Sequence, residues 1–256
     1  MTILNRLIGQ DGSIHYNFTA SKPFKAINSL KKADIISARD FAYNMTFGGQ
    51  GEHRATRTGG NYTRMNGEIF LNAFNGKLGE FAIKRYLEGL GFEVPSVDLS
   101  VYGLGDWDTA DFILNNRKLS VKTIKYFSNL LLLEKGDWNA DGCYIPNLLN
   151  DGGKYDYHIL VRLKGNIELE KELKMQRKFY NTLTKEEIKA LTDNYTVQFD
   201  LPGVATCDML KKIVLANQVV HQNEYIGQST KLQADNYYIQ SGDLIPIEHF
   251  IEAIKL

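Results

Sequence analysis

A carboxylate and a lysine stand close together in residues 108–126, DTADFILNNRKLSVKTIKY. Asp111 heads a short apolar run, and Lys122 lies inside the next run, after a polar turn at 115–118. Two short strands joined by such a turn form an antiparallel pair, and their side chains alternate between two faces. Ser120 and Lys122 therefore share one face, and we expect the turn to bring Asp111 beside that face.

A second carboxylate, Glu80, lies on the preceding amphipathic segment. Carboxylate oxygens are the ligands that magnesium prefers, and the bound ion can neutralise a phosphoryl group and activate water. A nearby lysine can orient that water, lower its pKa or stabilise developing charge. Glu80, Asp111 and Lys122 therefore have the chemistry of a site for metal-dependent hydrolysis of a phosphodiester.

Three runs of this chain, GKLGEFAIKRYLEGLGF, DTADFIL and LSVKTIK, resemble the core of the PD-(D/E)xK nucleases. In that superfamily a helix with a glutamate precedes a β-meander that carries the motif aspartate and lysine. The resemblance covers residues 76–126, with YDYHILVRL as a following core strand. It makes Glu80 the helix acid, Asp111 the motif aspartate and Lys122 the motif lysine. The overall layout is similar to that of type II restriction endonucleases.

The resemblance implies a magnesium-dependent, sequence-specific endonuclease that hydrolyses double-stranded DNA in host defence, with Mn²⁺ able to replace Mg²⁺. Cleavage would leave a 5′-phosphate and a 3′-hydroxyl, and palindromic sites would favour a homodimer. Two alternatives stay open. One is a nuclease of the same superfamily that acts on damaged or branched DNA or on one strand, and the other is a DNA-binding module with a decayed site.

The sequence departs from the family pattern at the motif acid, where Ser120 stands in the arrangement D-x8-S-x-K. Thr109 and Ala110 precede Asp111, so the literal Pro-Asp pair is absent as well. Ser120 itself, or the backbone carbonyl of Val121, offers a ligand oxygen at this place.

A carboxylate from elsewhere can replace the missing motif acid, with Glu80 as the first candidate and Asp108 as the second. Asp106 and Asp108 are also alternatives to Asp111 as the metal ligand, and we favour Asp111 because an apolar strand follows it directly.

Each of the three main residues has a structural alternative. Lys122 can be a strand lysine whose stem packs while its head reaches solvent. Asp111 can be a turn acid near the glycine-rich run GLGDWDT. Glu80 can be an exposed helix acid that pairs with Lys84 one turn later.

Basic residues that could contact DNA gather in two segments. Arginine can pair with phosphates or bind guanine bidentately in the major groove. The two segments are the glycine-rich segment 51–64 and the segment 117–125. The alternative for the former is a solvated basic loop. The residues are His53, Arg54, Arg57, Arg64 and Lys125. The polar segment 223–242 is rich in amides, which can read base edges, or it is a polar hairpin.

Hydrophobic periodicity predicts an α/β fold with mixed α and β elements, and the resemblance implies a restriction-endonuclease-like core with a central mixed β-sheet flanked by helices. The expected helices span 24–46, 67–90, 166–179, 184–192, 207–220 and 246–254. The expected strands span 92–102, 111–114, 119–126, 155–163, 195–200 and 237–239, and the first three are expected to form a meander after the long helix. Thr184 and Glu187 predict a capping box.

The 256 residues, without repeats or a linker, predict one nuclease domain, 1–256. We expect an N-terminal DNA-contact region at 1–66, a catalytic core at about 67–165 and a C-terminal α/β region at 166–256. The formal net charge is zero, so no overall basic balance indicates nucleic acid. Cys143 and Cys207 stand alone, which argues against structural zinc. No signal peptide or membrane-spanning run is present, so we expect a soluble cytoplasmic protein.

Overall fold

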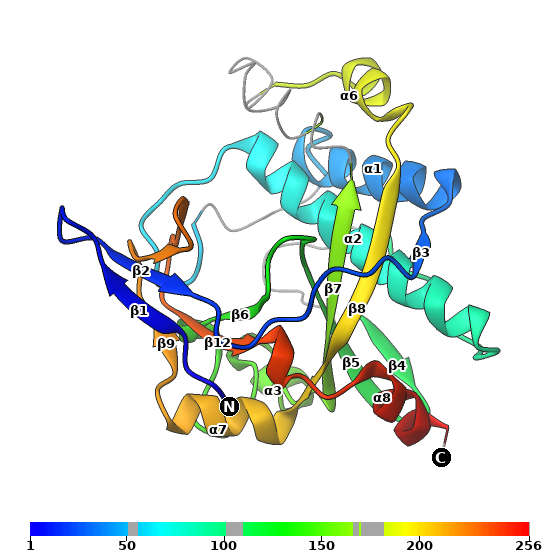
Figure 1. The fold of residues 1–256 in the computed structure, drawn as a ribbon. Helices are drawn as coiled ribbons and strands as arrows, with labels where there is room; N and C mark the ends of the chain where they lie inside the picture. The colour runs from blue at the N-terminus through cyan, green and yellow to red at the C-terminus, as the bar shows by residue number, and fades with distance from the viewer. Residues whose placement is uncertain (51–55, 101–109, 166–168, 170–181, 256) are drawn as a thin grey trace.

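The computed structural model describes residues 1–50, 56–100, 110–165, 169 and 182–255, and it confirms the mixed α/β fold class. Three β-sheets and the helices form successive layers (Figure 1). The strands are β1 Asn5–Ile8, β2 Ile14–Asn17, β3 Asn28–Ser29, β4 Phe112–Leu114, β5 Arg117–Lys125, β6 Leu130–Glu134, β7 Tyr157–Gly165, β8 Val197–Thr206, β9 Val219–Val220, β10 Tyr225–Ile226, β11 Thr230–Lys231 and β12 Asn236–Gln240. The α-helices are α1 Lys32–Thr46, α2 Asn66–Gly89, α3 Leu148–Asp151, α6 Lys185–Thr192, α7 Cys207–Leu215 and α8 Ile247–Ile254.

The central sheet has five strands in the order β3-β8-β7-β5-β4. β4 and β5 form the expected antiparallel hairpin. Asn115 and Asn116 make its turn with positive φ angles of 48° and 60°, which asparagine tolerates better than most residues. β5 then runs parallel to β7, and β7 is antiparallel to β8.

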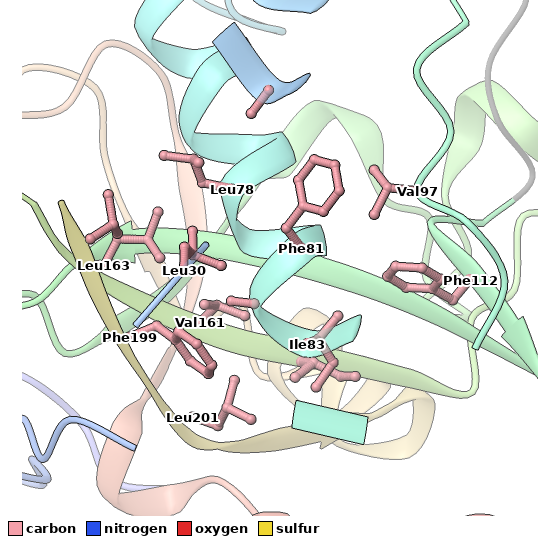
Figure 2. Packing of buried hydrophobic residues seen from close by; sticks show 14 of the residues in the cluster. Leu30, Leu78, Phe81, Ile83, Val97, Phe112, Val161, Leu163, Phe199 and Leu201 are labelled. Carbon is pink, nitrogen blue, oxygen red and sulfur yellow. The ribbon is translucent and has the colours of Figure 1, made fainter. Parts of the chain in front are cut away.

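One face of the central sheet is covered by α1, α2 and α8 (Figure 1). Alternate residues of β7 point into this layer and meet the apolar side of α2, where side chains recur at three- and four-residue steps. Figure 2 shows this packing, with residues from the helices, the central strands and the segment before β4 gathered in one cluster. The labelled members are Leu30, Leu78, Phe81, Ile83, Val97, Phe112, Val161, Leu163, Phe199 and Leu201.

The opposite face of the central sheet is covered by a smaller sheet, β6-β12-β9, and by α7. Leu160 of β7 and Ala205 of β8 pack there against Leu131 and Tyr237. A third sheet, β1-β2-β10-β11, lies on the far side of the small sheet, where Tyr16 packs against the outward residues of β6 and β12. The central sheet is therefore covered on both faces.

A buried ion pair ties the N-terminal segment to the central sheet. Arg162 of β7 is almost fully buried and donates from Nε to Asp200 Oδ1 of β8 over 2.8 Å. Its guanidinium also donates to the carbonyls of Lys22 and Pro23 over 2.7 and 2.9 Å and to Asn129 Oδ1 over 3.0 Å. The pair thereby satisfies the charge of Arg162 and fixes three separate segments.

The predicted three-strand meander is wrong in its first strand, because residues 92–100 form no strand. Pro95 has no backbone N–H for a ladder. Lys84 of α2 also donates to the carbonyls of Val94 and Pro95, so this segment is held by the helix. β5 has β4 on one side, and on its other side it pairs with β7.

The other predicted elements differ from the structure mainly at their ends, whereas β1, β2 and β6 were not predicted. The first helix begins at Lys32 rather than residue 24, because residues 27–30 bond to the edge of β8 through Ile27 and Leu30. α7 ends at Leu215, and the chain turns at Asn217, whose φ is 47°, into β9. The predicted helix 166–179 lies outside the described residues except for Leu169. The capping box of Thr184 and Glu187 is confirmed.

Candidate active site

The β4–β5 hairpin holds Asp111 against the edge of β5. The register pairs Phe112 with Leu119, so Asp111, one residue earlier, lies opposite Ser120. Asp111 Oδ2 accepts a hydrogen bond of 2.6 Å from the backbone N–H of Val121. A carboxylate that accepts from a backbone N–H makes a charge-assisted bond, which is stronger than a neutral one. The carboxylate is therefore fixed at the residue next to Lys122.

The two faces of β5 have separate roles. Leu119 and Val121 pack into the layer that contains α2, whereas Ile124 packs into the layer that contains the small sheet and α7. Because side chains alternate along a strand, Ser120 and Lys122 lie on the same face as Ile124. This confirms the expected sharing of a face, with Ser120 buried and Lys122 half-buried.

The backbone of Val121 supplies a second oxygen at this edge. In a strand the N–H and C=O groups of one residue point to the same neighbour. Since the N–H of Val121 points to Asp111, its carbonyl oxygen faces the same side, just beyond the first residue of β4. Asp111 and the carbonyl of Val121 are thus the two oxygen groups that this arrangement presents together.

Glu80 is not the exposed acid of the structural alternative, because only 6% of the residue is exposed. It forms an ion pair with Lys77 of the same helix, with 2.9 Å between Oε1 and Nζ. Lys84, its proposed exposed partner, pairs with Glu88 instead. Glu80 and Lys77 therefore form a buried ion pair with a structural or functional role, and Glu80 is not part of a solvated helix face.

The position of α2 separates Glu80 from the lysine of β5. Gly79, the residue before Glu80, faces Thr123 of β5. α2 therefore packs on the face opposite to the side chain of Lys122. Within the ranges that the structure describes, no three or more His, Cys, Asp or Glu side chains gather in a group that could hold a metal ion. Asp106 and Asp108 lie outside those ranges, so the role of Asp108 stays a prediction.

A histidine that is not among the predicted site residues lies next to this site. His158 of β7 is the register partner of Ser120, and it is fully buried. Its ring makes edge contacts with Trp138 and Tyr155, at centroid distances of 5.2 and 5.4 Å. Burial, together with the positive charge of Lys122, holds the pKa of the His158 imidazole well below its ordinary value.

Neither ring nitrogen of His158 has a hydrogen-bond partner among the described residues. One sequence signal could have drawn attention to His158: it is the single histidine in the apolar run YDYHILVRL, which predicts a buried strand. A strand buried on both faces does not reveal which face each residue occupies, so its proximity to Ser120 could not be read from the sequence.

The predicted DNA contacts are distributed unevenly. Arg57 is committed to an ion pair with Glu134, at 2.7 Å, and donates from Nε to Gln233. Arg64 is half-buried just before α2, and Lys125 is exposed at the end of β5, with Nζ 5.9 Å from the ring centroid of Phe127. His53 and Arg54 lie outside the described residues.

The described part of the predicted DNA-contact segment 51–64 lies beside the other such segment, 223–242. Gln222 donates from Nε2 to Asn61 Oδ1 over 2.7 Å and to the carbonyl of Gln233 over 3.1 Å. A Cβ atom at Gly60 would also press against the carbonyl of Gln233. The end of the glycine-rich loop therefore packs on the amide-rich C-terminal segment.

Comparisons with protein-family models, with curated proteins and with solved structures gave no match. Among the described residues, no helix has the length and apolar character that a membrane span requires.

Proposed function

We propose that the protein is a magnesium-dependent, site-specific endonuclease that hydrolyses double-stranded DNA, as type II restriction enzymes do. The observation that carries the proposal is the hydrogen bond from the N–H of Val121 to Asp111, which places a carboxylate beside the peptide that leads into Lys122. The resemblance puts the motif aspartate at this place, next to the strand that carries the motif lysine.

The oxygens of Asp111 and of the Val121 carbonyl fit a hard divalent cation such as Mg²⁺, or Mn²⁺ in its place. When bound, such an ion neutralises phosphoryl oxygens and lowers the pKa of a water ligand. Asp111 contributes the negative charge, and its hydrogen bond to Val121 fixes the carboxylate at the edge of β5. The half-buried Lys122 holds a positive charge on the same strand, where it orients the attacking water and stabilises charge in the transition state.

The carboxylate of the family's motif acid is missing from this arrangement. Ser120 gives a hydroxyl where the family pattern gives a carboxylate, and Glu80 lies with α2 on the other face of the sheet. This favours, as a second candidate, a DNA-binding module whose catalytic site has decayed. The two candidates predict opposite results when the protein is given DNA and metal.

The test is incubation of a long duplex with the purified protein, with Mg²⁺, with Mn²⁺ and with a chelator. The proposal predicts discrete fragments that need the metal and that are lost in Asp111→Asn and Lys122→Met. Asp193→Asn and Lys212→Ala change exposed residues of the same types at a distance from β5, and they should cut normally.

Other outcomes separate the alternatives. DNA that is bound but never cut, with equal binding by the Lys122→Met variant, supports the decayed module. Cleavage of branched, damaged or single-stranded DNA, with plasmid left intact, supports the other type of nuclease. Action in the cytoplasm as a homodimer is part of the same proposal, and the molar mass in solution, with and without DNA, tests the dimer.

A further inference from the structure

We propose that His158 supplies a nitrogen ligand to the cation held by Asp111, in the place that the missing motif acid leaves open. This rests on the proposed function only in taking Asp111 as a metal ligand. The chemical consequence is a site with a preference for transition-metal ions such as Mn²⁺ over Mg²⁺.

The first argument is the alignment of three residues across β5 and its two neighbouring strands, whose order is visible in Figure 1. Asp111 lies opposite Ser120, and Ser120 is paired with His158, so the three residues form a row across β4, β5 and β7. Adjacent strands are about 4.8 Å apart, so Asp111 and His158 are separated by roughly 10 Å of backbone with one serine between them. Ser120, the residue between them, has a short side chain, and the longer side chains of Asp111 and His158 can reach toward each other over it.

The second argument is the unused polar capacity of His158. Both ring nitrogens are buried, and neither has a hydrogen-bond partner among the described residues. Buried polar atoms in proteins nearly always have a partner, and an exception needs an explanation. The aromatic surroundings, Trp138 and Tyr155, would hold a phenylalanine equally well, so packing alone gives no use for the nitrogens.

The third argument is the chemistry of the set. Asp111 offers a carboxylate, Val121 a carbonyl and Ser120 a hydroxyl, all of which suit Mg²⁺. An uncharged imidazole adds a nitrogen, which suits Mn²⁺ and its heavier neighbours better than Mg²⁺. The positive charge of Lys122 on the same face opposes any cation, so the additional ligand matters for affinity.

Pulsed electron paramagnetic resonance tests the inference. The protein is first freed of metal, and Mn²⁺ is then added in the absence of DNA. The wild-type spectrum should show modulation from a coordinated ¹⁴N nucleus, and this should change when histidine alone is labelled with ¹⁵N. In His158→Phe the modulation should disappear, and the affinity for Mn²⁺ should fall about tenfold or more relative to that for Mg²⁺. His249→Asn, in an exposed position of α8, should leave both unchanged.

A wild-type protein whose bound Mn²⁺ shows no nitrogen modulation overturns the inference, and this result does not depend on whether any variant folds. Modulation that persists in folded His158→Phe also overturns it. The result is separable from the proposed function: DNA cleavage without nitrogen modulation removes only the role of His158. Nitrogen-bound Mn²⁺ without cleavage of any DNA removes only the nuclease.

Discussion

Replacing Gly79 with alanine places a methyl group where helix α2 touches strand β5. A Cβ atom at this position overlaps Thr123 Oγ1 and lies 3.1 Å from Thr123 Cβ and 3.3 Å from its Cγ2. Threonine in a strand has restricted rotation about χ1, so it cannot easily turn away. The strand next to Lys122 must therefore move, or the helix must.

The magnitude follows from two opposing terms. Alanine in place of glycine stabilises a helix interior by about 1 kcal/mol. Overpacking in a filled core costs about 1–3 kcal/mol, and three atoms closer than ordinary contact place this site at the upper end. We expect a net loss of about 2 kcal/mol in the free energy of unfolding, which lowers Tm by about 4–8 °C in a chain of this size.

Urea denaturation of four proteins measures the effect: wild type, Gly79→Ala, Thr123→Ala and the double variant. Thr123→Ala removes Oγ1, which overlaps the added methyl group, and Cγ2, while Cβ stays. The hydroxyl it removes is buried without a partner among the described residues, so the change costs little by itself. The double variant should then match Thr123→Ala within about 0.5 kcal/mol, a coupling of about 2 kcal/mol. Gly76→Ala, on the same helix with open space at its Cβ, should stabilise the protein.

If Gly79→Ala is as stable as Gly76→Ala, or if the two changes add without coupling, the close contact between α2 and β5 is refuted. Helix α2 would then not restrict the position of the strand that carries Lys122.

Three further predictions concern buried charge and capping. Arg162→Met or Asp200→Leu alone should each lower the free energy of unfolding by about 3–5 kcal/mol, because each leaves a buried charge unpaired. The double variant should lose less than the sum of the two single losses. Additive losses in urea denaturation would contradict the buried ion pair. The imidazole of His158 binds a proton less readily in the folded protein than in the unfolded one, whose pKa is about 6.5. Below that pH the free energy of unfolding of the metal-free protein should therefore fall by about 1.4 kcal/mol per pH unit, and His158→Phe should reduce this fall between pH 6.5 and 5.5. Identical pH slopes for the two proteins would show that the ring takes up its proton in the folded state. Thr184→Ala should cost about 1 kcal/mol by removing the cap of α6, and unchanged thermal unfolding would contradict the capping box with Glu187.

The sequence predicted those elements in which one periodicity dominates. Helix α2 followed from apolar residues at three- and four-residue steps, and the β4–β5 hairpin followed from Asn115 and Asn116 between two apolar runs. The parallel pairing of β5 with β7 could not be predicted in this way, because it joins strands that are far apart in the chain. The segment 92–100 alternates partly, yet it packs against the helix without joining a sheet.

The same contrast holds for the candidate site. Alternation along β5 was enough to place Ser120 and Lys122 on one face, and the turn brought Asp111 to them. The burial of Glu80 was missed because it depends on tertiary packing: its partner Lys77 lies over the ring of Phe41 of α1, which packs against α2. His158 was missed because its proximity to Ser120 arises from the parallel register.

The most direct test of the central claim is the cleavage of long duplex DNA by the wild-type protein and by Asp111→Asn. Asparagine keeps a carbonyl oxygen that can accept from the N–H of Val121, so the fold should stay intact while the charge that holds the cation is lost. We predict discrete, metal-dependent fragments with the wild type and uncut DNA with the equally stable variant. Equal cleavage by both proteins, or intact DNA with the wild type under every metal condition, would contradict the proposed nuclease site.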